Sequence, residues 1–173
     1  STLAQALGPV GVWGHLDSLS TDQLRGYAAR VGELGFGALW VPETVGREPF
    51  VSLALASSSA GSLWLGTSIA SIYARDAETA KTAAMTLHEA TQGRFVLGLG
   101  VSHPHLVTRL RGHEYGPPVT RMRDYLADIR RLPVCLARLL ARTDYLARLG
   151  TAALTPGPGG RLYAVGSGDG WFA

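Results

Sequence analysis

Residues 38–42 read ALWVP, a continuous apolar run bounded by Gly37 and Glu43. A short apolar run between such residues is typical of a strand that is buried on both faces. Strands of this kind belong to parallel sheets whose two faces are covered by helices. The chain is therefore expected to alternate strands with helices on either side of this run.

The alternation continues in both directions along the chain. Upstream, Ser20 and Gln23 have the spacing of a capping box, and they predict a helix over 21–34 that Gly35 ends. The strand starts near residues 10, 38, 63 and 94 lie 28, 25 and 31 positions apart, which is the length of one strand-helix unit. The other predicted elements are strands over 9–14, 63–71 and 94–101 and helices over 48–58, 76–91 and 118–131.

Two α/β architectures have buried parallel strands that alternate with helices, the open doubly wound sheet and the β/α barrel. A dinucleotide fingerprint would favour the open sheet, but Gly98 and Gly100 supply only a G-x-G, and they follow the fourth strand. We therefore predict a barrel. A complete barrel takes roughly 250 residues, so this chain of 173 residues is expected to form a partial (β/α)8 barrel of about four units.

The composition is that of a globular protein, with 46% hydrophobic and 17% charged residues. The formal net charge of +3, from interspersed acids and bases, argues against nucleic acid as a partner. A single cysteine, Cys135, and an N-terminal stretch without a signal-peptide pattern predict a cytoplasmic protein. Residues 49–74 carry no charge, but the serines and Gly61 in their middle predict helix, turn and strand rather than a membrane span.

The strand-helix pattern stops at Arg131. We expect two parts, a half barrel over 1–131 and a divergent helical and Gly/Pro-rich tail over 132–173, as a truncated or frameshifted gene would give. Within the tail, residues 135–149 form an amphipathic stretch whose three arginines are few for a membrane-surface helix. A packing helix is the expected alternative there.

Three segments, taken in order, resemble the bacterial luciferase-like family, and most closely its coenzyme F420-dependent oxidoreductases. The segments are GFGALWVPETVGREPF (35–50), LGTSIASIYARD (65–76) and GRFVLGLGVSH (93–103). The resemblance implies a β/α barrel with a flavin or deazaflavin across the carboxyl ends of its strands. It implies hydride transfer between F420 and a small organic substrate, and an FMN-dependent monooxygenase is the alternative.

The resemblance also implies which residues hold the cofactor. Several members of the family have a non-proline cis peptide in the third strand, and Ser68-Ile69 is the matching pair here. Glu43 lies where relatives place an acid near the deazaflavin; the alternative is a solvated acid at the start of a helix. Thr44 stands where some dehydrogenase members carry a catalytic histidine. Arg75 is expected either to meet an anionic cofactor tail or to form an ion pair near the start of the third helix.

The end of the fourth strand supplies the remaining candidates. His103 lies where some relatives hold a proton-donating acid, and an imidazole can transfer a proton near neutral pH. His105 and His113 are close in sequence, but a proline intervenes and no carboxylate has ligand spacing, so no metal is expected. Gly98 and Gly100 would let a cofactor or substrate approach the backbone, or would relieve crowding where strand meets helix.

A second reading of the chain is an inactive or structural partial barrel. The first and fourth strands would each have an open edge, and open strand edges favour association. A second copy of the chain, paired through these edges in a homo-oligomer, is therefore one expected partner. The phosphate-binding loops that usually follow strands seven and eight would be missing. Weak or absent cofactor affinity is therefore expected of this polypeptide alone. If the chain is an oxidoreductase, its expected partner is a small-molecule substrate.

Overall fold

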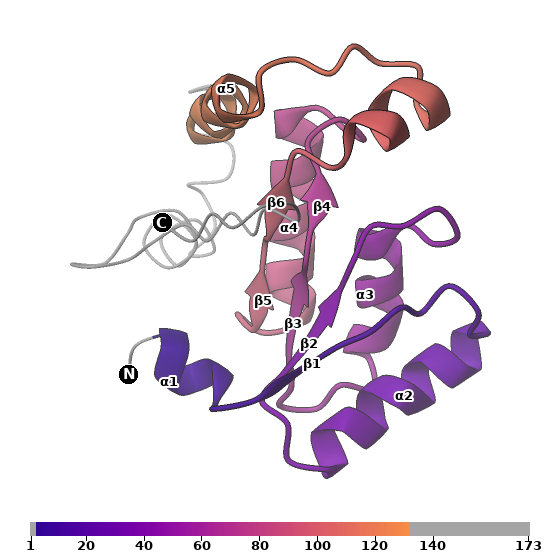
Figure 1. Cartoon of the computed structure of the whole chain (residues 1–173). Coiled ribbons are helices and arrows are strands. Elements are labelled where there is room, and N and C mark those ends of the chain that lie inside the picture. The colour runs from indigo at the N-terminus through magenta and orange to yellow at the C-terminus, as the bar shows by residue number, and fades with distance from the viewer. Residues whose placement is uncertain (1–2, 132–173) are drawn as a thin grey trace.

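The computed structural model describes residues 3–131, in which strands and helices alternate as predicted (Figure 1). All strand pairs are parallel, in one sheet of order β1-β2-β3-β5 and a short ribbon of β4 and β6. The strands are β1 (Gly11–Trp13), β2 (Ala38–Val41), β3 (Trp64–Thr67), β4 (Ala70–Ser71), β5 (Phe95–Val96) and β6 (Leu99–Gly100). The helices are α1 (Leu3–Leu7), α2 (Thr21–Glu33), α3 (Pro49–Ser57), α4 (Ala77–Ala90), a π-helical turn (Leu106–Leu110) and α5 (Pro118–Arg130).

These bounds match the predicted elements closely, and α1 and the π-helical turn are additions. The predicted third strand is divided into β3 and β4, and the predicted fourth into β5 and β6. The predicted capping box of Ser20 and Gln23 is present, and Gly35 has the left-handed φ of 82° expected of a helix end. The expectations for the tail and its amphipathic stretch concern residues 132–173, which lie outside the described residues.

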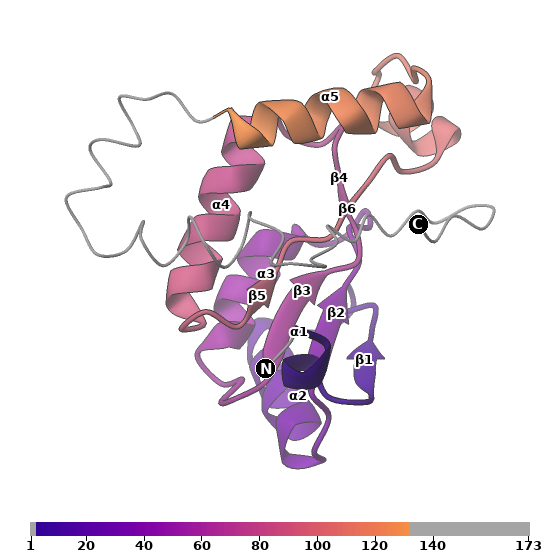
Figure 2. The ribbon, with the colours of Figure 1, turned by 90° about the vertical axis from the view of Figure 1, so that its left-hand side faces the viewer.

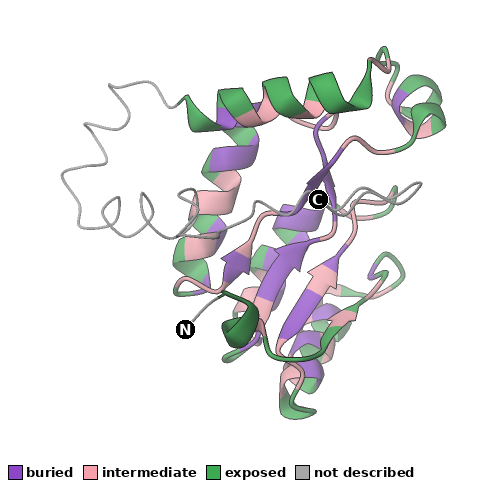
Figure 3. Cartoon of the chain, turned by 60° about the vertical axis from the view of Figure 1, so that its left-hand side comes forward, coloured by how far each residue is buried: buried purple, intermediate pink, exposed green. Residues whose placement is uncertain are grey.

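Helices α2, α3 and α4 cover one face of the sheet, and α1 lies on the other side, near the strand starts (Figure 2). Leu39, Leu65 and Phe95 are in register across β2, β3 and β5. They share one buried core with Leu24 of α2 and Leu53 of α3 (Figure 3). Burying each such side chain stabilises the fold by about 1.5–3 kcal/mol, so this helix-covered face holds the sheet together.

The opposite face of the sheet carries the indole of Trp40, because alternate residues of a strand point to opposite faces. A Cβ atom on Gly66 would lie 2.4 Å from Cζ3 of Trp40, and one on Gly11 would lie 2.8 Å from its Nε1. Gly11 and Gly66 belong to the strands on either side of β2. The indole therefore lies flat across three strands, over two positions that have no side chain.

The stretch 49–74, which is long enough to span a bilayer, forms α3, a turn and β3 as predicted. Among residues 3–131, no helix has both the length and the apolar character needed to cross a membrane.

Helix α5 crosses the end of α4 that lies nearer β4 (Figures 1 and 2). Buried Lys81 of α4 donates to the carbonyl of Ile129 near the end of α5, and burial lowers the pKa of this lysine. The hydroxyl of Tyr125 lies 3.1 Å from the carbonyl oxygens of both Arg75 and Asp76. Burial raises the pKa of Tyr125 to about 12. Tyr125 and Ile129 therefore lie on the side of α5 that packs against the rest of the fold.

Candidate functional site

The site lies where the carboxyl ends of β2, β4 and β6 meet. The peptide bond between Ser68 and Ile69 is cis, as the family resemblance implies. Residues of β1 and β2 and the segment after β2 hold it: Ser68 N donates to Val41 O (2.8 Å), Trp13 Nε1 donates to Ser68 O (2.9 Å), and Glu43 N donates to Ile69 O (3.0 Å). The Ile69 amide N–H donates to no backbone or side-chain acceptor within residues 3–131. One backbone donor is therefore left for a ligand.

Glu43 occupies the centre of a buried charge cluster, and its side chain is 5% exposed. Its Oε2 accepts from Arg75 Nη1 (2.8 Å) and from the amide of Ser71 (2.7 Å). Its Oε1 accepts from Arg75 Nη2 and Arg111 Nη2, both at 2.9 Å. The expectation of a solvated acid is wrong, since both carboxylate oxygens are engaged. The carboxylate fixes two arginines and the backbone just beyond the cis peptide.

Arg75 makes contacts across the barrel wall instead of pairing near its own helix start. Its side chain is 10% exposed, and it bonds Glu48 Oε1 at 3.0 Å as well as Glu43. Its guanidinium also lies 4.8 Å from the centre of the Phe50 ring. Asp76, the first acid at the start of that helix, instead caps α4 through the amide of Thr79 (2.7 Å). The sequence offered no local signal for the pair of Arg75 and Glu43, because the two residues are 32 positions apart.

The glycines after the fourth strand pack against the interrupted third strand. A Cβ atom on Gly98 would lie 2.1 Å from the carbonyl oxygen of Thr67, and one on Gly100 would lie 2.6 Å from Cγ1 of Ile69. The Thr67 hydroxyl also donates to the carbonyl of Gly98 (2.7 Å) and accepts from its amide (2.9 Å). Both positions therefore require glycine because the third strand occupies the space. They still help to form the site, since they set where Ile69 lies.

The structure thus brings five of the six candidates together at the strand ends: Glu43, Ser68, Ile69, Gly98 and Gly100. The sixth, His103, is exposed in the following loop, and its ring stacks on His105 with centroids 5.7 Å apart. Over residues 3–131, no three His, Cys, Asp or Glu residues cluster in a way that could hold a metal ion.

Comparison with known proteins identifies the family. A family model described as luciferase-like monooxygenase matches residues 5–169. The chain belongs to this luciferase-like family. It is 32% identical over 123 residues to Rv3520c of Mycobacterium tuberculosis. That relative has the provisional name of a coenzyme F420-dependent oxidoreductase, and the match covers 71% of this chain and 35% of the relative. A second M. tuberculosis relative, the uncharacterized Rv1360, is 34% identical over 99 residues. This match covers 57% of our chain and 28% of the relative.

Solved structures similar to this luciferase-like chain confirm the fold. The F420-dependent tetrahydromethanopterin reductase of Methanopyrus kandleri aligns with a TM-score of 0.59 at 18% identity, over 69% of this chain and 38% of its own. The FMN complex of the oxygenating constituent of 3,6-diketocamphane monooxygenase from Pseudomonas putida aligns with a TM-score of 0.55 at 15% identity. This alignment covers 61% of our chain and 33% of the P. putida protein. The predicted partial barrel is confirmed. The chain spans about a third of the length of the curated relatives it matches.

The loop after β6 in the luciferase-like chain is fixed to the rim by aromatic and charged contacts. The rings of Tyr73 and Tyr115 stack with centroids 5.6 Å apart, and the Tyr73 hydroxyl accepts from the amide of Gly116 (3.3 Å). Arg111, from the same loop, reaches Glu43. Sequence reasoning missed Arg111, because its partner is 68 positions away.

A pocket of about 390 Å³ lies beside Glu43. The residues that line it are Thr44, Val45, Leu110, Arg111 and His113. The hydroxyl of Thr44 donates a hydrogen bond to Asp17 Oδ2. The luciferase-like chain therefore has both a candidate cofactor position, at Ile69, and an adjoining space for another molecule.

Proposed function

We propose that this chain forms the N-terminal half of the cofactor site of an F420-dependent oxidoreductase, which transfers a hydride between the deazaflavin and a small organic substrate. The observation that carries the proposal is the N–H of Ile69, which has no acceptor within residues 3–131 and lies between β3 and β4, beside the residue that follows β2 by two positions. Ile69 is 9% exposed, and a donor in so buried a residue calls for an acceptor. A carbonyl or nitrogen on the edge of a deazaflavin ring supplies one.

The residues around Ile69 fix the backbone segment against which such a ring would lie. Trp13 holds the carbonyl of Ser68, and Glu43 binds the amide of Ser71, two residues further on. These contacts fix the segment, so that the Ile69 donor needs no reorganisation when a ring binds. When bound, F420 supplies a two-electron hydride carrier. His103, in the loop beyond Gly100, is our candidate for the acid or base that moves a proton on the substrate.

Family membership supports F420 and FMN alike, so the choice of F420 is part of the proposal. The relative Rv3520c and the M. kandleri reductase are named for F420, and the P. putida enzyme is bound to FMN. Parallel titrations of the purified chain, followed by cofactor fluorescence, decide between them. Weak but saturable binding of F420, tighter than that of FMN, is the expected result. Tighter binding of FMN would favour the FMN-dependent monooxygenase.

A matched pair of glycine variants tests where the cofactor lies. Gly100→Ala would place a methyl group 2.6 Å from Ile69 Cγ1, so Ile69 must shift and F420 binding should weaken at least tenfold. Gly26→Ala, in the middle of α2, meets no atom within 4 Å and should leave binding unchanged. Equal affinities for the two variants would place the cofactor elsewhere.

The second candidate function is a structural half barrel that associates through its edges. It is favoured by the strand order, which leaves β1 and β5 as the outer strands of the described sheet. Light scattering after size-exclusion chromatography, over a range of protein concentrations, would reveal a dimer. A dimer that binds neither F420 nor FMN at saturating concentration would support this function over the first.

A further inference from the structure

The pocket beside Glu43 adjoins the proposed cofactor position. Two of its lining residues, Thr44 and Val45, directly follow Glu43, whose backbone amide bonds the carbonyl of Ile69 (3.0 Å). Its volume of about 390 Å³ is within the usual range for sites that hold small molecules. A molecule in this pocket would therefore lie next to a ring held at Ile69, where the substrate of a hydride transfer has to be.

One wall of the pocket carries a cation with unused donors. Arg111 is 27% exposed, and within residues 3–131 its guanidinium makes a single hydrogen bond, from Nη2 to Glu43 Oε1. Arg75 already engages both oxygens of that carboxylate. A guanidinium has five N–H donors in a fixed plane, which suits the binding of a second carboxylate. The remaining donors of Arg111 are available to an anionic ligand.

The rest of the pocket shows what kind of anion it suits. Val45 and Leu110 are apolar and 72% and 53% exposed, so they offer surface to an apolar body. His113 stands on the same loop as Arg111 and offers a second polar group. The hydroxyl of Thr44 donates a hydrogen bond to Asp17 Oδ2, so this polar group is already engaged. A ligand with one charged end and one apolar end therefore has a defined orientation, with its carboxylate toward Arg111.

We propose that this pocket binds an organic carboxylic acid as the substrate of the oxidoreductase, with Arg111 as the residue that binds its carboxylate. The assignment of the acid as substrate rests on the proposed function. Glu43 is a positioning residue in this site, because its Oε1 accepts a hydrogen bond from Arg111 and its Oε2 accepts one from the amide of Ser71, two residues after Ile69. One buried carboxylate thus sets the distance between the bound acid and the cofactor position.

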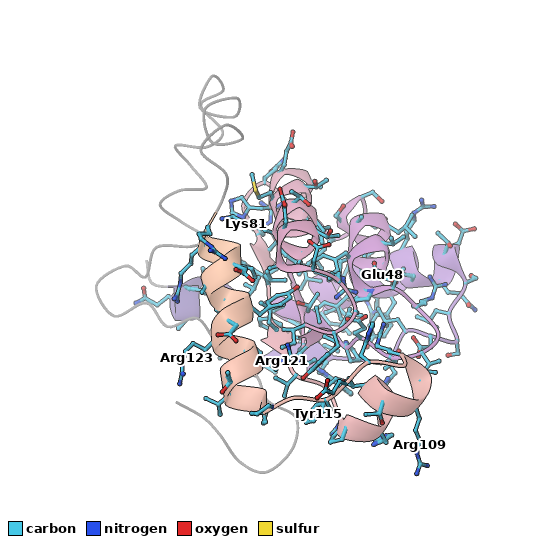
Figure 4. The ribbon with its side chains drawn as sticks, turned by 90° about the horizontal axis from the view of Figure 1, so that it is seen from above. Glu48, Lys81, Arg109, Tyr115, Arg121 and Arg123 are labelled. Carbon is cyan, nitrogen blue, oxygen red and sulfur yellow. The ribbon has the colours of Figure 1, made fainter. Side chains whose placement is uncertain are left out.

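Calorimetric titration of the whole chain without cofactor tests the proposal, with hexanoate as the probe and hexanamide as its uncharged counterpart. Hexanoate should bind more tightly than hexanamide. Arg111→Gln should weaken hexanoate binding about tenfold, as expected for the loss of a charge-assisted hydrogen bond, and should leave hexanamide unchanged. Arg109→Gln is the matched control, because it removes an equal charge two positions away, where the side chain points out from the molecule (Figure 4).

Three results would overturn the proposal: no hexanoate binding, equal affinity for the two probes, or equal weakening by Arg111→Gln and Arg109→Gln. Circular dichroism of each variant checks that it is folded, and unchanged hexanamide binding by Arg111→Gln checks that the pocket is intact. The F420 titration is independent of these measurements. Hexanoate binding without F420 binding would refute the proposed function and leave an acid-binding pocket, and the reverse would refute the pocket alone.

Discussion

The four-stranded sheet and the rim above it are built in different ways. The sheet is held by apolar side chains in register, such as Leu39 and Leu65, and by helices that are close in sequence to the strands they cover. The rim is held by a buried carboxylate, two arginines and hydrogen bonds between residues 28 to 68 positions apart. The difference teaches that the helices and strands of the framework are encoded by local sequence patterns, whereas the site is encoded by particular pairs of polar residues that are distant in sequence. Single substitutions in each region can test this division.

The largest effect is expected in the sheet, from Leu65→Ala. Leu65 is 1% exposed at the centre of the core, so its truncation should lower the free energy of unfolding by about 3–4 kcal/mol. Urea unfolding followed by circular dichroism measures the change. Val51→Ala, at a position that is 58% exposed on α3, is the control and should stay within about 0.5 kcal/mol of the parent. A loss below about 1 kcal/mol for Leu65→Ala would contradict the division.

The next effect is expected in the rim, from Glu43→Gln. An amide removes the charge that two arginines share, and within residues 3–131 Arg75 then keeps only Glu48 as an anionic partner. The free energy of unfolding should therefore fall by about 2–3 kcal/mol. The matched control is Glu33→Gln, which breaks an exposed pair with Arg30 and should cost less than about 0.5 kcal/mol. The same unfolding assay applies. Equal losses for the two variants would mean that the buried cluster adds nothing to stability.

A smaller effect is expected where sheet and rim meet, from Trp13→Phe. The change keeps an aromatic ring but removes the Nε1 donor to the carbonyl of Ser68, and it should cost about 1 kcal/mol of stability. The free energy of F420 binding should change by more than the free energy of unfolding, because the segment that contains Ile69 is no longer held by this hydrogen bond. An unchanged F420 affinity would show that Trp13 does not support the site.

The smallest effect concerns pH, through His88 at the end of α4. Burial lowers the pKa of this imidazole from its ordinary value of 6.5. The unfolded chain therefore takes up the proton more readily than the folded chain below pH 6.5, and stability should fall as the pH is lowered from about 7 to 5. His88→Leu should make the stability less dependent on pH in that window. A parent protein whose stability does not change between pH 7 and 5 would contradict this expectation.

The contrast between sheet and rim also explains what could be predicted from the sequence. The helices followed from apolar periodicity and caps such as Ser20 with Gln23, which act over three or four residues. The cis bond at Ser68-Ile69 has no signature in propensity, and only the family resemblance pointed to it. The resemblance also placed Glu43 near the site. Its arginine partners could not be predicted, because no local rule links residue 43 to residue 111.

The structure also corrects the reason for the glycines. Gly98 and Gly100 were expected either to make room for a ligand or to relieve crowding, and the space beside them is filled by Thr67 and Ile69. A sequence shows that a position has no side chain, but it does not show which neighbour uses the space. That neighbour comes from another strand, and it is identified only when the register is known.

The indole of Trp40 sets the depth of the mouth. It spans Gly11 and Gly66, one register step before Val41 pairs with Thr67, and so it forms a floor beneath the level of Ser68. A molecule that approaches this face of the sheet from the rim meets the indole there. A small residue at position 40 would open a shaft between the two glycines and would let a ring sink below the reach of the Ile69 amide.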